Sequence, residues 1–110
     1  MNSKRKGNAG ERELAAILRG YGYETRRGQQ FSGGPDSPDV IGLPGIHIEC
    51  KRVERLNVHE AMKQAIRDAA GRFLPAVFHR RNRGEWLVTM RLEDFMEIYR
   101  EWQKTVSSSI

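Results

Sequence analysis

Apolar residues recur along the chain at two different spacings, which predict helices in three places and strands between them. Within residues 8–20, Leu14, Ile17 and Leu18 return at every third or fourth position, and this spacing lays one apolar stripe along a helix. The same spacing predicts a second helix over residues 58–72 and a third over residues 92–102. Glycines at positions 20 and 22 are typical of the end of the first helix.

Shorter apolar runs bounded by glycine and proline predict five strands. "YETRRGQQFSGG" (23–34) resembles a strand that leads into a glycine-rich turn, and "DVIGL" (39–43) and "IHIECK" (46–51) resemble a hairpin joined at Pro-Gly. "PAVFHRR" (75–81) and "EWLVTM" (85–90) predict two more strands. The resulting order, α-β-β-β-α-β-β-α, predicts an α/β fold in which helices flank a mixed central sheet.

The length of 110 residues suits one domain covering residues 1–110, with a core that a partner subunit would enlarge. We expect residues 1–7 to form a mobile basic arm and residues 104–110 a frayed tail. No stretch approaches the roughly 20 apolar residues of a membrane span, and the N-terminal segment lacks the apolar part of a secretory signal. Cys50 is a lone cysteine, which fits a reducing compartment. These features predict a cytoplasmic protein without a membrane partner.

The charge balance indicates a polyanionic partner. Nineteen Lys and Arg stand against fourteen Asp and Glu, and the sequence pI is about 9.8. Most of the basic residues are arginine, whose planar fork suits phosphate. This composition favours a nucleic-acid binder, although an ordinary soluble surface could carry the same net charge of +5.

The candidate chemistry lies in the predicted hairpin. Alternate side chains of a strand share a face, so Glu49 and Lys51 point away from the core, together with His47. Asp39 opens the neighbouring strand and would lie close to Glu49. Two adjacent carboxylates repel each other unless a cation lies between them, and Mg²⁺ favours oxygen ligands. The alternative is structural: Asp39 caps a turn, and Glu49 and Lys51 belong to the solvated face of an edge strand.

A wider pattern carries a resemblance. The "PD" at 38–39 and the "ECK" at 49–51 resemble the PD-(D/E)xK nuclease signature. Together with "KGNAGERELAAILRGYGY", "SGGPDSPDV", the helix that contains Gln64 and "PAVFHRR", they resemble archaeal-type Holliday junction resolvases and their small phage-borne relatives, over about residues 4–100. The resemblance implies a restriction-endonuclease-like core of α-β-β-β-α-β order.

The resemblance also implies a metal site. Glu11 takes the place of the glutamate that the first helix presents in such nucleases, while Asp39 and Glu49 match the acids that hold the metal. The backbone carbonyl of Cys50 would be a further ligand. The expected ion is Mg²⁺, with Mn²⁺ as a substitute, and no small-molecule cofactor is expected.

The remaining expected site residues surround these acids. Lys51 matches the catalytic lysine, Ser32 resembles a serine near the scissile phosphate, and Gln64 resembles a glutamine on the second helix; as alternatives, Ser32 is a turn residue and Gln64 an ordinary surface residue. "PDSPD" also offers Asp36, which we interpret as a loop residue or a peripheral participant, and His47 could lie beside the site. The expected phosphate contacts are Lys4, Arg5, Lys6, Arg26, Arg27, Arg80, Arg81 and Arg83.

The resemblance therefore predicts a metal-dependent DNA endonuclease that resolves four-way junctions. Two matched cuts favour a homodimer, for which Trp86, Phe95 and Tyr99 are candidate contacts. Three alternatives stay open: a nuclease of the same fold that acts on flap, nicked or linear DNA, a DNA-binding module without catalysis, and a basic RNA- or protein-binding domain.

Overall fold

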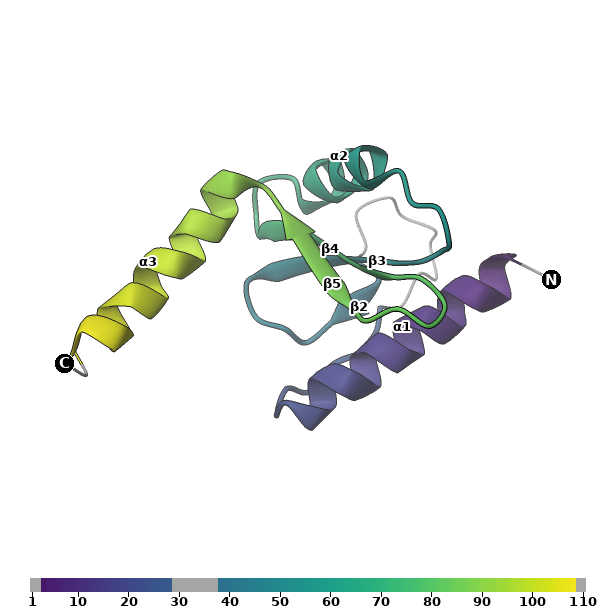
Figure 1. Ribbon diagram of the computed structural model, residues 1–110, viewed down its shortest axis with the longest axis horizontal. Coiled ribbons are helices and arrows are strands. Elements are labelled where there is room, and N and C mark those ends of the chain that lie inside the picture. Colours follow the sequence, from purple (N-terminus) through teal and green to yellow (C-terminus); the bar gives the residue numbers. More distant parts are fainter. Residues whose placement is uncertain (1–2, 29–37, 109–110) are drawn as a thin grey trace.

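The computed structural model describes residues 3–28 and 38–108, with side chains for residues 8–28 and 38–107. Three helices and five strands follow one another in the predicted order (Figure 1). They are α1 (Ser3–Gly20), β1 (Arg26–Arg27), β2 (Val40–Ile41), β3 (Ile46–Arg52), α2 (Val58–Ala69), β4 (Leu74–Arg80), β5 (Leu87–Met90) and α3 (Leu92–Ser108). Within these residues, no helix has the length and apolar character needed to cross a membrane.

The five strands form one mixed sheet in the order β1-β2-β3-β4-β5. The pair β3–β4 is parallel, and the other neighbours are antiparallel. The long strand β3 is therefore central, paired with β2 on one side and β4 on the other. This arrangement confirms the predicted α/β fold with a mixed sheet and is compatible with a restriction-endonuclease-like fold.

Helix α1 covers one face of the sheet. Leu14 and Ala15 are buried against Val40 and Ile48 in the larger core cluster. The predicted stripe is partly wrong, because Ile17 is 38% exposed. The side of α1 that faces the sheet instead carries the buried residues Glu11, Leu14 and Ala15.

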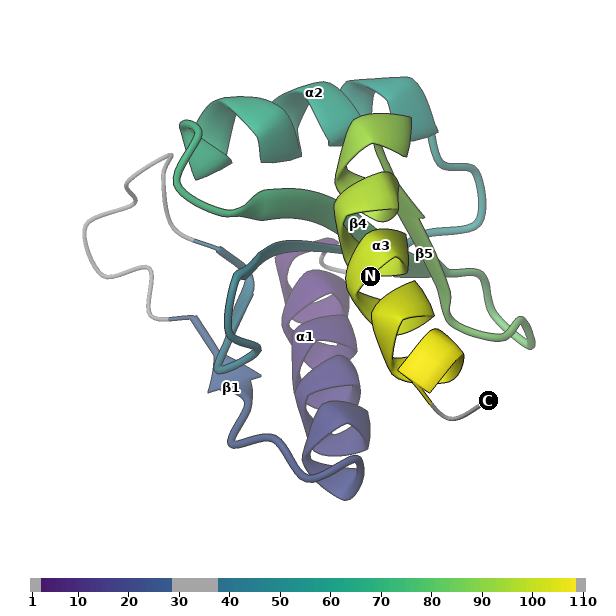
Figure 2. The same ribbon diagram turned by 90° about the vertical axis from the view of Figure 1, so that its left-hand side faces the viewer.

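Helix α2 covers the opposite face, so the sheet lies between two helices (Figure 2). The helix begins after Asn57, whose side chain accepts a hydrogen bond from the backbone N–H of Glu60. Ala61 and Ala65 then pack on Val77 of β4. Because α2 covers this face, the even-numbered and odd-numbered side chains of β3 are both enclosed along much of the strand.

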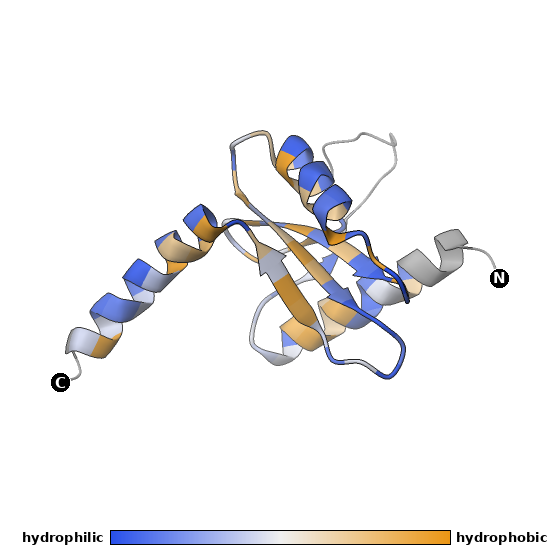
Figure 3. Ribbon diagram, turned by 45° about the horizontal axis from the view of Figure 1, so that its top comes forward, coloured by the Kyte–Doolittle hydropathy of each residue, from blue (hydrophilic) through white to orange (hydrophobic). Residues whose placement is uncertain are grey.

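The terminal helices are longer than expected. Helix α1 begins at Ser3, within the expected basic arm of residues 1–7, and α3 continues to Ser108, beyond the expected end at residue 102. Helix α3 projects away from the sheet (Figure 1). Hydrophobic and hydrophilic residues alternate along it (Figure 3), and its exposed apolar side chains are Leu92, Phe95, Ile98, Tyr99, Trp102 and Val106.

The two faces of α1 give the first testable prediction. Leu14→Ala removes a side chain that is 2% exposed and should lower the free energy of unfolding by about 2–5 kcal/mol. Ile17→Ala on the same helix should cost well under half as much. Urea unfolding of both variants at one protein concentration measures the difference. Equal losses would contradict the observed position of α1 on the sheet.

Candidate active site

The pairing of β2 with β3 places Asp39 beside Glu49. Val40 lies opposite Ile48, and the backbone N–H of Asp39 donates to the carbonyl of Ile48 over 2.9 Å. The Oδ2 atom of Asp39 accepts a hydrogen bond from the backbone N–H of Cys50 over 2.8 Å. The side chain of Asp39 therefore turns toward β3, as the predicted hairpin required.

The segment before β2 is also held from the side of β1. The backbone N–H of Gly28 donates to the carbonyl of Asp39 over 2.9 Å. A Cβ atom at position 28 would lie 2.1 Å from the carbonyl oxygen of Pro38, so any larger residue would force the two segments apart. Glycine at position 28 therefore lets Asp39 be fixed between β1 and β3.

Glu49 is a buried acid at the centre of the sheet. It is 1% exposed, and its Oε2 atom forms an ion pair with Lys51 Nζ at 3.5 Å. Burial, followed by the negative charge of Asp39, raises the pKa of Glu49 to about 7, although Lys51 opposes the shift. The alternative of a solvated edge strand is thus wrong for Glu49, because β3 is central and α2 covers this face.

Glu11 reaches the same region from α1. Burial and then the charge of Asp39 raise the pKa of Glu11, while Arg27 opposes the shift through an ion pair at 3.4 Å. Arg27 also donates to Asn8 Oδ1 over 3.0 Å. The charge of Asp39 therefore raises the pKa of both Glu11 and Glu49. A bound cation would remove the repulsion between these carboxylates.

A compact group of potential metal ligands differs from the expected set of Glu11, Asp39 and Glu49. Among the residues that the structure describes, His47, Glu49 and Asp68 form the group whose ligand atoms all lie within 4.8 Å of one another. The carboxylates of Glu11 and Asp39 do not belong to it. Asp68 was not predicted as a site residue, although it lies on the same face of α2 as the buried Ala61 and Ala65. An acid within an apolar stripe was the sequence signal that could have identified it.

Lys51 and Gln64 line one groove between the end of β3 and α2. Lys51 is partly exposed there, so its ammonium group is accessible while Glu49 beside it is enclosed. Cys50 points to the opposite face and packs on the larger core cluster. Burial, with smaller effects of the nearby acids, raises the pKa of the Cys50 thiol to about 12, which excludes a thiolate nucleophile at neutral pH. Ser32 and Asp36 lie outside the described residues.

The expected phosphate contacts are dispersed. Arg26 is exposed on the edge strand β1, and Arg81 and Arg83 are exposed between β4 and β5. Arg27 contacts Glu11 inside the site, and Arg80 contacts Glu13. The side chains at positions 4–6 lie outside the described part. Contact with phosphate stays a prediction for all of these residues.

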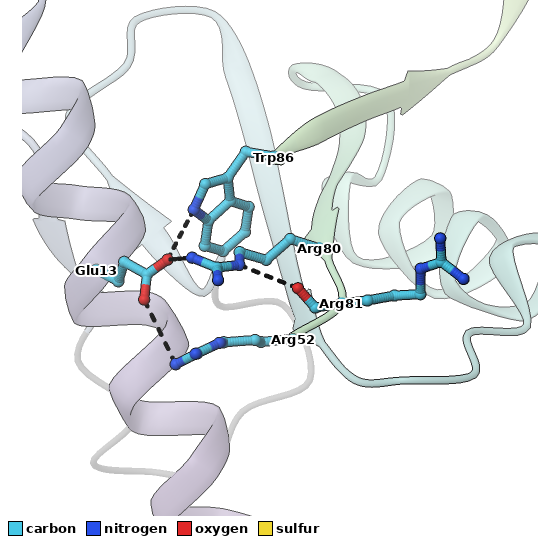
Figure 4. Close-up of polar contacts among 5 residues, drawn as sticks. All are labelled: Glu13, Arg52, Arg80, Arg81 and Trp86. Atoms are coloured by element: carbon cyan, nitrogen blue, oxygen red, sulfur yellow. Dashed lines mark hydrogen bonds and ion pairs between the residues drawn. The ribbon is translucent and has the colours of Figure 1, made fainter. Parts of the chain in front are cut away.

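Glu13 forms a polar cluster that the sequence did not indicate (Figure 4). It accepts hydrogen bonds from Arg80 and from Trp86 Nε1, the latter over 2.9 Å, and it pairs with Arg52 at 3.4 Å. These contacts connect α1 to β3, to β4 and to the segment before β5. Trp86 also packs against the larger core cluster, so its side chain is engaged within the domain and is a poor candidate for the dimer interface.

The comparisons with known proteins identify the family. A protein-family model described as "Phage putative PDDEXK endonuclease" matches residues 2–110. The chain belongs to this family. Membership in the phage PDDEXK endonuclease family confirms the resemblance to PD-(D/E)xK nucleases. No curated protein and no solved structure matches the chain.

The raised pKa of Glu49 predicts that stability depends on pH. A folded-state pKa near 7 lies above the ordinary value of 4.5, so the folded protein binds a proton more tightly than the unfolded chain, and ionisation of Glu49 costs stability as the pH rises from about 4.5 to 7. In metal-free protein, Glu49→Gln should therefore raise the Tm by several degrees at pH 8, since about 1 kcal/mol shifts the Tm of such a domain by roughly 4–8 °C. At pH 5 the gain should vanish. Thermal unfolding in EDTA measures both values, and an equal change at the two pH values would contradict the shift.

Proposed function

We propose that this member of the phage PDDEXK endonuclease family is a Mg²⁺-dependent endodeoxyribonuclease that cuts four-way DNA junctions. The observation that carries the proposal is that Asp39, directly before β2, lies opposite Glu49 of β3 and raises its pKa, with Lys51 Nζ 3.5 Å from Glu49 Oε2. This acid-acid-lysine set stands on the scaffold of its family and argues against a binding module without catalysis.

The acids fit a divalent cation. Glu11, Asp39 and Glu49 lie close enough for Asp39 to raise the pKa of the other two. A hard cation such as Mg²⁺ takes oxygen ligands and would remove this repulsion, and Mn²⁺ would substitute. We propose that these three carboxylates hold the ion with the backbone carbonyl of Cys50. Arg27 would stabilise Glu11 in its ionised form.

The residues of the proposed site have different roles in the reaction. When bound, a divalent cation lowers the pKa of water and polarises a phosphoryl oxygen. Lys51 presents its ammonium to the groove beside Glu49, where it can orient the attacking water or stabilise the charge that develops on the phosphate. Gln64 lines the same groove and can position the substrate.

DNA affinity would come from the basic surface. With a net charge of +5 and exposed arginines at positions 26, 81 and 83, the chain offers contacts to phosphate that do not depend on sequence. Binding should therefore weaken steeply as the salt concentration rises. Junction DNA concentrates phosphates from four arms, and in a phage-infected bacterium such DNA lies in the cytoplasm.

A homodimer would place two active sites on one junction. On α3, Leu92, Phe95, Tyr99, Trp102 and Val106 follow one another at alternating steps of three and four residues, the spacing of a coiled-coil seam. Phe95 stacks on Tyr99 with ring centroids 6.2 Å apart, and Tyr99 contacts Trp102 at 5.6 Å. All five side chains are exposed. We propose that two copies of the chain pair through this seam.

Cleavage of defined substrates tests the proposed function. With Mg²⁺ or Mn²⁺, the protein should nick a four-way junction at symmetric positions and leave flap and linear duplex intact, and EDTA should abolish the reaction. Lys51→Ala should reduce cleavage by about 10²-fold or more, while binding in a gel-shift assay stays within a few-fold. Lys104→Ala, which removes an exposed lysine of α3 outside this groove, is the matched control and should cut normally.

The other outcomes separate the alternatives. Cleavage of flap, nicked or linear DNA without a preference for junctions would support a nuclease but contradict the four-way junction as its substrate. Binding without any cleavage would favour the non-catalytic module. Full activity of Lys51→Ala would contradict the role of the lysine.

The dimer is tested by sedimentation. The wild-type chain, of 12.6 kDa, should sediment at twice its mass at micromolar concentration. Tyr99→Lys places a charge at the centre of the seam and should give a monomer. Glu97→Gln changes the charge by the same amount on the opposite side of α3 and should leave the dimer intact. A wild-type protein that is only monomeric would remove the geometric basis for paired cuts.

A further inference from the structure

Three neighbouring residues under α2 each carry a buried polar atom without a hydrogen bond. These atoms are Nε2 of His47, Oε1 of Glu49 and Oδ1 of Asp68, and none has a hydrogen-bond partner among the described residues. The three residues are 2%, 1% and 4% exposed. Their ligand atoms lie within 4.8 Å of one another. Buried polar atoms in native proteins nearly always have a partner, so three in one place indicate a missing group.

Among the side chains that the structure describes, the nearby cations do not fill this position. Lys51 pairs with the other carboxylate oxygen of Glu49, Oε2. Arg67 Nε lies 3.7 Å from Asp68 Oδ1, beyond hydrogen-bond distance, on a side chain that is 70% exposed. Arg72 acts on the pKa of His47 only through its charge, as does the acid Asp39. The space between the three atoms therefore receives no proton donor from these residues.

The chemistry of the three atoms favours a cation over a water molecule. When both acids are ionised, their carboxylates only accept hydrogen bonds, and Nε2 of a neutral imidazole accepts when its proton is on Nδ1. A water molecule donates two hydrogen bonds, which leaves one of three acceptors without a partner. A metal ion can bind all three. Two ligands at about 2.1 Å from one ion lie roughly 3.0–4.2 Å apart, which the group of atoms can reach with small movements.

We propose that His47, Glu49 and Asp68 form a second divalent-cation site, selective for a transition metal such as Mn²⁺ or Zn²⁺. Imidazole nitrogen suits these ions better than Mg²⁺, whereas the acids around Asp39 offer only oxygen. Glu49 would belong to both sites, with Oε1 directed toward the second ion and Oε2 toward Lys51. The second ion would hold the Glu49 carboxylate in place and connect β3 to α2.

Nitrogen coordination of bound Mn²⁺ tests this site without DNA. Pulsed electron paramagnetic resonance of untagged protein with Mn²⁺ should show coupling to an imidazole nitrogen in the wild type. The coupling should disappear in His47→Gln and persist in His59→Gln, a matched control at an exposed position of α2. Asp68→Asn should weaken binding of the nitrogen-coupled ion by about 10-fold or more.

The result that would overturn the proposal is saturating Mn²⁺ without nitrogen coupling in the wild type, or coupling that survives in His47→Gln. If His47→Gln does not fold, the wild type still decides, because the chain has three histidines and His59→Gln and His79→Gln test the other two. The site and the proposed function can fail separately. A protein that cleaves no DNA but shows the nitrogen coupling would support the second cation site and contradict the proposed function. An active nuclease without the coupling would contradict the second cation site alone.

Discussion

The active-site geometry depends on the antiparallel register of β2 and β3. This register opposes Val40 to Ile48 and lets the Cys50 N–H donate to Asp39 Oδ2 over 2.8 Å. A shift of one residue would turn Glu49 to the other face of the sheet and break this contact. The close approach at Gly28 holds the same segment from the other side. The position of one carboxylate therefore follows from backbone pairing on two strands and not from its own flexible side chain.

Burial makes these acids sensitive to each other. Glu49 is enclosed by α2, and burial followed by the charge of Asp39 raises its pKa to about 7, against the opposing effect of Lys51. Glu11 is raised in the same direction by burial and by Asp39. Buried ion pairs such as Glu49–Lys51 and Glu11–Arg27 add little to stability, because well-packed apolar residues often serve as well. The presence of these acids is explained if cations bind between Asp39 and Glu49 and next to His47 and Asp68.

The order of elements and the chemistry of the hairpin followed from local sequence, because strand alternation and turn residues act over a few positions. The alternation of side chains along a strand places Glu49 and Lys51 on one face, whether the strand is at the edge or in the centre of the sheet. Whether water or a helix covers that face depends on distant residues, and the edge-strand alternative could not be rejected before the sheet order was known. For the same reason, the sequence does not indicate that Asp68 lies near His47 and Glu49 of β3, or that Glu13 pairs with Arg52 and Arg80.

Anomalous diffraction from crystals that contain Mn²⁺ would locate the ion. We expect an anomalous peak in contact with the carboxylates of both Asp39 and Glu49. Crystals of active protein at millimolar Mn²⁺ in which no ion contacts both carboxylates would contradict it, because the register of β2 and β3 would then bring the two acids together for some purpose other than binding a cation.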